Sequence, residues 1–267
     1  MTPSTASPLR LIARYRSILL RTTAVEIRSL YADSALGLAW VLVGPLLLLG
    51  LYSVVYIMIF RIQPPGFSGA EYALYVFSGL VPTISFSMAL NIGAGALASN
   101  RQVLLNTVFP AELLPLRAVL VQSVPMTVAL AMVALAVALV KGSLGPAALL
   151  VPLVIVLQVM FVTGIVWVLS LLTLALRDIQ QLLQYAMLIL IIITPIAYTP
   201  EMIPAKLKLL MYANPLYYYV AAFQQMLVFG ALPAPGILAA CTGLAFASFW
   251  LGFRLFQRVK LTFYDYA

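Results

Sequence analysis

Long stretches without a charged residue divide this chain of 267 residues. Six of them reach the roughly 20 apolar residues that a membrane-spanning helix needs. These runs are Ser34–Phe60, Tyr72–Asn100, Ala118–Val140, Gly142–Leu176, Ile179–Tyr198 and Pro235–Phe253. Charged residues make up only 8% of the chain, against about 25% in ordinary soluble domains. The sequence therefore predicts an all-α integral membrane protein and excludes disordered, nucleic-acid-binding and secreted disulfide-rich classes.

Turn residues at the ends of these runs set the expected helix limits. The sequence Gly142-Ser143-Leu144-Gly145-Pro146 is typical of a turn, so the fourth helix is expected to begin near Ala147. We predict six spans in a single domain covering residues 1–267, at about residues 35–60, 72–98, 117–140, 147–176, 180–198 and 235–256. Six spans place both termini on the same side of the membrane.

The segment between the last two spans, residues 199–234, interrupts this pattern. A continuous helix through Lys206, Lys208 and Pro215 would be costly, because proline breaks helices and buried charge is expensive in a membrane. We therefore predict a re-entrant or interfacial hairpin that enters and leaves on the outer side. The alternative is a seventh span over Leu216–Leu232.

Lysine and arginine residues indicate the orientation. With the N-terminus inside, eleven of the fifteen fall on the cytoplasmic side and four on the outer side. Positive residues concentrate in cytoplasmic loops of membrane proteins. The sequence thus predicts a multi-pass protein of the cytoplasmic (inner) membrane with both termini in the cytoplasm. The net charge of +8 is attributed to this asymmetry and to attraction for anionic lipid.

Residues 9–31 form a separate basic element. At 100° per residue, four arginines fall within about 40° of one another on a helix. They are Arg10, Arg14, Arg21 and Arg28. This pattern predicts an amphipathic helix in the cytoplasmic interface, in contact with membrane lipids. Such a helix either only fixes the topology or also packs against the membrane domain or a partner.

The residues for enzymatic chemistry are missing. The chain has no histidine, a single cysteine, Cys241, and no Gly-x-x-x-x-Gly-Lys-Ser/Thr loop for ATP. Its seven carboxylates lie at span ends, in loops or in the tail. We therefore expect no catalytic residue, metal or cofactor in this chain. The absence of mid-membrane carboxylates also argues against proton-coupled transport and, less strongly, against sodium-coupled transport.

Neutral polar and aromatic residues remain within the spans. Polar residues such as Gln158 are expected either to hydrogen-bond between helices or to line a weakly polar pathway. Tyr52, Tyr56 and Phe60 recur at four-residue spacing, and Tyr75 and Tyr198 are expected on the same outer side. These rings form either an interfacial aromatic belt or a surface on which sugar rings stack.

The loop Ser99–Pro110 is short, mildly amphipathic and cytoplasmic in this topology. Asn100 and Arg101 are suited to cap and anchor a short helix, which Pro110 would stop. The segment is either a plain connector or a projecting element that docks into a cytosolic partner.

Four short motifs occur in order along the chain. They are Tyr31-Ala32-Asp33-Ser34-Ala35-Leu36-Gly37-Leu38-Ala39-Trp40 with Gly44-Pro45-Leu46; Phe109-Pro110-Ala111-Glu112-Leu113-Leu114-Pro115-Leu116; Arg177-Asp178; and Thr194-Pro195-Ile196-Ala197-Tyr198 followed by Ile203-Pro204 and Asn214-Pro215-Leu216. Together they resemble the membrane subunits of polysaccharide-type ATP-binding-cassette exporters, the group that exports O-antigen, capsule and teichoic acid. One difference is Phe223-Gln224, where many members carry Phe-Arg.

The resemblance implies an assembly and a set of sites. It implies a channel of two copies of this chain, two cytosolic ATPase subunits that bind ATP and magnesium, and a lipid-linked glycan as substrate. It implies that Arg177 and Asp178 lie at the cytoplasmic entrance and that Thr199–Leu216 lines the outer mouth. It also implies a coupling helix that enters the ATPase. The residues of this coupling element are Asn100, Arg101, Val103, Leu104, Leu105, Phe109 and Pro110.

Two other functions stay open from the sequence. One is an ATPase-driven exporter of a different lipid or of a drug, which aromatic rings facing lipid would favour. The other is a membrane glycosyl- or acyltransferase, which would need a base and a donor site that the residues above do not supply.

Overall fold

A computed structural model describes residues 7–55, 67–106, 109–176, 178–198 and 204–264. Every regular element in these ranges is a helix, which confirms the all-α prediction. Four helices are long and apolar enough to cross a membrane, namely Gly69–Ala94, Leu113–Lys141, Pro146–Ala175 and Pro235–Lys260. Gly37–Ser53 and Ile179–Ile193 are apolar but shorter. The predicted first and fifth spans therefore stay predictions.

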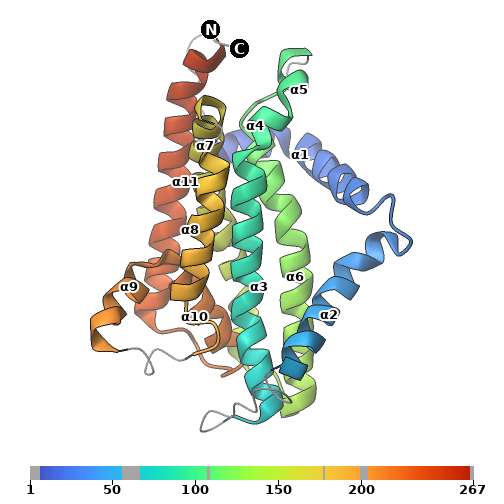
Figure 1. Cartoon of the computed structure of the whole chain (residues 1–267), viewed down its shortest axis with the longest axis vertical. Coiled ribbons are helices and arrows are strands. Elements are labelled where there is room, and N and C mark those ends of the chain that lie inside the picture. Colours follow the sequence, from blue (N-terminus) through green and yellow to red (C-terminus); the bar gives the residue numbers. More distant parts are fainter. Residues whose placement is uncertain (1–6, 56–66, 107–108, 177, 199–203, 265–267) are drawn as a thin grey trace.

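The four long helices run side by side along the molecule (Figure 1). They are α3 (Gly69–Ala94), α6 (Leu113–Lys141), α7 (Val151–Ala175, preceded by the 3-10 turn η3, Pro146–Leu150) and α11 (Pro235–Tyr264). The main packed pairs are α7 with α11 and α3 with α6. Local chemistry sets several ends: Ser68 and Glu71 form a capping box at the start of α3, and Gly142 ends α6 in the left-handed conformation.

Shorter elements lie at the two ends of this bundle (Figure 1). One end, here called the termini end, carries α1 (Pro8–Leu30), α4 (Ala96–Ser99), α5 (Arg101–Asn106) and the C-terminal end of α11. Towards the opposite end, the hairpin end, lie η5 (Ala205–Leu207), α9 (Lys208–Ala213) and α10 (Pro215–Leu227). The turn η1 (Gly37–Ala39) leads into α2 (Trp40–Ser53), and α8 (Ile179–Ile193) follows α7.

Most predicted boundaries agree with these helices, with three differences. The second helix stops at Ala94 and the chain continues as the separate α4. The fifth helix ends at Ile193 because Thr194 is extended ahead of Pro195, as residues preceding proline tend to be. The last helix extends to Tyr264.

The helix α10 is almost entirely enclosed by the bundle. Ten of its 13 residues are buried, and it packs on α3, α7 and α11. Its start is fixed by Asn214, whose Oδ1 accepts a hydrogen bond from the Leu216 backbone N–H at 3.0 Å and whose Nδ2 donates to Thr194 Oγ1 at 2.7 Å. With 13 residues, α10 is about 20 Å long, which is short of the roughly 30 Å hydrocarbon layer.

Lys141 connects three elements at the hairpin end. Lys141 Nζ lies 3.2 Å from Glu71 Oε1 and donates to the Val228 carbonyl at 2.7 Å. It thereby connects the end of α6, the start of α3 and the chain just after α10.

Gln158 tests the expectation about polar residues within the spans. It is 2% exposed on α7, and its Nε2 donates to the Pro82 carbonyl of α3 at 2.9 Å. At this position the interhelical hydrogen bond is confirmed.

Candidate functional site

The chain between α3 and α6 carries the seven residues of the predicted coupling element. Its short helix α5 lies at the termini end of the molecule (Figure 1). Val103 and Leu105 on α5 are 40% and 57% exposed. Leu104 is half-buried and packs against an apolar cluster that includes Leu97 and Phe256. One side of α5 is thus held by the bundle, while two apolar side chains face outward.

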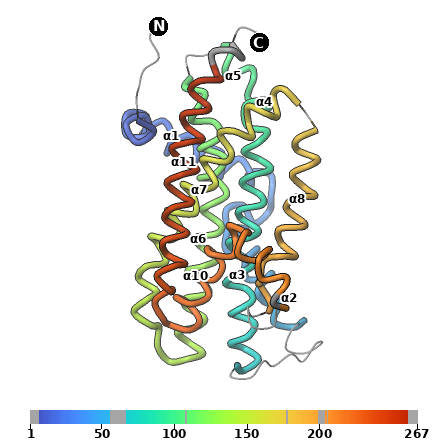
Figure 2. Tube along the Cα trace, turned by 90° about the vertical axis from the view of Figure 1, so that its left-hand side faces the viewer, coloured from blue at the N-terminus to red at the C-terminus, as the bar shows by residue number. Residues whose placement is uncertain are grey.

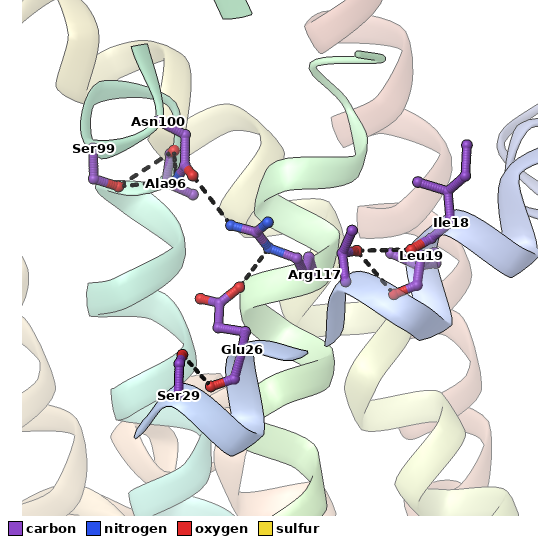
Figure 3. Close-up of polar contacts among 9 residues, drawn as sticks. Ile18, Leu19, Glu26, Ser29, Ala96, Ser99, Asn100 and Arg117 are labelled. Atoms are coloured by element: carbon purple, nitrogen blue, oxygen red, sulfur yellow. Dashed lines mark hydrogen bonds and ion pairs between the residues drawn. The ribbon is translucent and has the colours of Figure 1, made fainter. Parts of the chain in front are cut away.

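Asn100 is the single residue between α4 and α5. Its Nδ2 donates to the Ala96 carbonyl at 2.9 Å, and its Oδ1 accepts from Arg117 Nη2 at 3.2 Å. The side chain therefore satisfies a carbonyl of the preceding helix α4 and contacts the guanidinium of Arg117. Figure 3 shows this amide between Ala96 and the guanidinium of Arg117.

Phe109 and Pro110 anchor the other end of this segment. Phe109 is half-buried and packs against the cluster of Leu19, Leu113 and Leu116. The Pro110 carbonyl accepts the backbone N–H of Leu113 at 3.0 Å. Both residues thus fix the start of α6 against α1, whereas Val103 and Leu105 point outward from the described structure.

Glu112, at the start of α6, is a buried carboxylate that the sequence analysis had placed only among residues at span ends. It is 3% exposed. Its Oε1 accepts from Gln257 Nε2 at 2.6 Å and pairs with Lys260 Nζ, and its backbone carbonyl accepts from Trp167 Nε1 at 2.9 Å. One residue thus joins the start of α6 to α7 and α11.

Replacing Lys260 by Met is expected to lower the free energy of unfolding by about 2 kcal/mol, because the buried carboxylate of Glu112 loses its cation. The loss is smaller than for a fully buried pair, because solvent partly screens this one. The melting temperature of the purified protein in detergent measures this. Arg258→Met is the matched control, since Arg258 is exposed on the same helix. Equal melting temperatures for the two variants would show that the Glu112–Lys260 pair contributes nothing.

The helix α1, which carries the predicted arginine face, lies across the bundle axis (Figures 1 and 2). All four arginines of that face are exposed. The residues that α1 buries are Pro8, Leu19 and Thr23. From the same helix Glu26 pairs with Arg117 of α6, with Oε2 and Nε 2.5 Å apart. The second sequence alternative for this helix, packing against the membrane domain, is therefore observed.

The aromatic candidates differ in their surroundings. Tyr75 is 3% exposed, stacks with Tyr72 at 6.4 Å between ring centroids, and contacts Phe67 and Phe229. It therefore presents no open ring face to a ligand in this structure. Tyr52 on α2 is half-buried against the main core.

The remaining candidates fall at or beyond the limits of the described structure. The hydroxyl of Tyr198 donates to the carbonyls of Ile192 and Ile193, both at 3.0 Å. Asp178 is exposed just before α8. Tyr56, Phe60 and Arg177 lie outside the described residues.

Gln224 occupies the position at which the chain departs from the motif Phe-Arg. It is 4% exposed on α10, and its Nε2 donates to the Ile196 carbonyl at 3.1 Å and to the Tyr75 carbonyl at 3.4 Å. A Cβ on Gly79 would lie 2.8 Å from this nitrogen, so α3 approaches α10 closely here. In this chain the position joins α10 to α3 and to the chain after α8.

Among the described residues, no group of three or more His, Cys, Asp or Glu side chains is arranged to hold a metal ion. The hydrogen bonds and ion pairs described above join residues of one helix to residues of another. Their arrangement therefore suits mechanical connection between helices.

Comparison with known proteins gives one family and several relatives. The family described as ABC-2 type transporter matches residues 19–228, from the middle of α1 to the end of α10. An O-antigen export system permease protein RfbA of Klebsiella pneumoniae is 26% identical over 249 residues, covering 92% of this chain and 93% of that protein. The protein of the same name from Myxococcus xanthus is 24% identical over 253 residues, covering 93% and 95%.

Proposed function

The chain belongs to the ABC-2 type transporter family, and we propose that it is the permease subunit of an exporter driven by ATP hydrolysis in a separate cytosolic subunit. The proposed substrate is a lipid-linked polysaccharide of the O-antigen type. The observation that carries this proposal is similarity over more than nine-tenths of the chain to O-antigen export permeases from two genera. The chain itself is proposed to have no ATP site, so ATP and magnesium bind in the partner.

The proposed orientation places the termini end in the cytoplasm and the hairpin end outside. In this orientation α1, α5 and the C-terminal end of α11 face the cytoplasm, together with most of the lysines and arginines. The exposed pair Val103 and Leu105 on α5 then faces the ATPase. The connection from α7 to α8, with Asp178, lies at the cytoplasmic entrance. In this arrangement the protein is embedded in the inner membrane by six spans.

Two weakly packed helices support a dimer. In its described residues α2 buries no side chain, and α8 buries only Leu183 and Met187. Both carry outward apolar residues, such as Leu47 at 60% and Ile192 at 67% exposed, and Figure 2 shows α8 and the lower part of α2 on the same side of the bundle. A second copy that covers this side would form the channel between the two chains.

The hairpin is proposed to be re-entrant from the outer side. Its helix α10 is too short to cross the membrane and is covered by α3, α7 and α11. Such cover is what non-spanning backbone needs at membrane depth. The same arrangement supports a single folded domain over the whole chain, because the hairpin packs on helices from both halves of the sequence.

Reconstitution tests the proposed function. The chain is placed in lipid vesicles with its proposed ATPase subunit and a lipid-linked glycan, and the ATP-dependent transfer of glycan across the membrane is measured. We expect transfer only when ATPase and ATP are both present. Transport by this chain alone would contradict the proposal, and transport of a different lipid or a drug in place of the glycan would identify the alternative substrate class.

Replacing Tyr52 by Ala is expected to reduce export about ten-fold without loss of assembly, because stacking on an aromatic ring stabilises a bound ring by about 1–3 kcal/mol when the ring is accessible. Tyr75→Ala is the comparison, since Tyr75 is buried among other rings and should reduce folding yield. Export rate and the amount of assembled complex are measured for both. Normal export with Tyr52→Ala would assign the ring to the interfacial belt.

A further inference from the structure

Arg117 joins three separate elements through one planar side chain. It lies in the second turn of α6. Its Nε faces Glu26 Oε2 of α1 at 2.5 Å, and its Nη2 donates to Asn100 Oδ1 at 3.2 Å. Figure 3 shows the guanidinium between these two side chains. Arginine alone among the basic residues can use different nitrogens of a rigid fork in this way.

Asn100 is positioned to set the direction of α5. It is the only residue between α4 and α5, and its backbone departs from the helix at φ −107° and ψ 24°. Its amide is held from both sides, by the Ala96 carbonyl and by Arg117. The group that Arg117 binds therefore lies at the junction of α4 and α5.

On its other side, Arg117 holds the part of α1 that is not tightly packed against α6. Leu19 is buried against Leu113 and Leu116 and fixes the middle of α1. Beyond it, an open pocket of about 480 Å³ adjoins the ion pair. The pocket is lined by Arg21, Thr22, Val25, Glu26, Ser29 and Arg117. Open space therefore lies beside the ion pair along the second half of α1.

We propose that Arg117 is a positioning residue that transmits a displacement of α5 to the interfacial helix α1. This inference rests on the proposed coupling role of α5. Movement of α5 on the ATPase turns the chain at Asn100, the guanidinium follows the amide, and Glu26 carries the second half of α1 with it. Because α1 lies across the bundle at the termini end, the motion reaches the membrane surface at the cytoplasmic side.

Arg117→Lys separates the two contacts of this residue. A lysine has one ammonium on a flexible stem, so it can pair with Glu26 but cannot also hold Asn100 in the arginine geometry. We expect the melting temperature and complex assembly to stay near wild type. The amount of glycan exported per ATP hydrolysed should fall about five-fold or more, since about five-fold is the lower limit of typical coupling between two sites. Arg16→Lys is the matched control, since Arg16 is exposed on α1.

A distance measurement distinguishes transmission from a purely structural role. In a Cys241→Ala background, spin labels at Ala24→Cys in the exposed second half of α1 and at Leu139→Cys on α6 report the position of this part of α1 in the assembled complex. We expect a non-hydrolysable ATP analogue to shift this distance in the wild-type background and to leave it unchanged with Arg117→Lys.

The outcomes separate this inference from the proposed function. If the wild-type complex exports no glycan with ATP, the proposed function fails. If the wild-type complex exports but Arg117→Lys gives the same export per ATP and the same distance shift, transmission through Arg117 is overturned. If Arg117→Lys assembles poorly, Asn100→Leu removes the same link from the other side, and normal coupling in that variant also overturns the inference.

Discussion

Replacing Leu105 by Asp is expected to lower ATP-driven export about 100-fold while the permease itself still folds. Leu105 is 57% exposed at the termini end, so its loss costs the isolated subunit little. In the proposed complex the same side chain lies against the ATPase. An unpaired carboxylate in an apolar contact costs about 3 kcal/mol, which corresponds to about 100-fold in affinity.

Three quantities test this prediction: the amount of permease in the membrane, the amount of ATPase that copurifies with it, and the glycan exported. Leu144→Asp is the matched control, because Leu144 is 40% exposed in a loop at the opposite end. Both variants should give normal amounts of permease, and only Leu105→Asp should lose the ATPase. Wild-type export by Leu105→Asp would remove α5 as the docking element.

Replacing Gly164 by Leu is expected to prevent α7 and α11 from packing. The free energy of unfolding should fall by about 4 kcal/mol or more, which is exceptionally large for a single substitution. A Cβ on Gly164 would lie 2.2 Å from the carbonyl carbon and oxygen of Ser248, and one on Gly252 would lie 2.1 Å from the Gly164 carbonyl oxygen. Such contacts involve backbone, which cannot move aside as a flexible side chain can. Small residues allow this close approach of membrane helices.

The measurement is the yield of monodisperse protein in detergent and its melting temperature. Gly243→Ala is the control, because it lies on the same α11 and a Cβ there meets nothing within 4 Å. That variant should be as stable as wild type, or slightly more stable from the gain in helix propensity. A normal yield for Gly164→Leu would mean that α7 and α11 can separate without loss of the fold.

The helical segments were largely predictable because each depends on a short, contiguous stretch of sequence. Charge-free runs located the four helices that are long and apolar enough to cross a membrane, and the basic periodicity located α1. Proline and charge marked the hairpin segment, where the structure has α9 and α10. The interfaces were not predictable in the same way, since apolar residues that face lipid and those that face protein look alike. Tyr75, a candidate for either an interfacial aromatic belt or a sugar-stacking surface, is enclosed by other aromatics in the structure.

The sequence by itself determined that this is a membrane protein, which segments are helical and which family it resembles. These features could be recognised because hydropathy and charge act locally along the chain. Only the tertiary structure decided which residues hold the helices together. Arg117 meets Glu26 and Asn100, and Glu112 meets Lys260, 148 positions away. In the sequence these residues lie far apart, at the ends of predicted spans or in the interfacial element. Their pairing depends on how the helices pack, which periodicity does not encode.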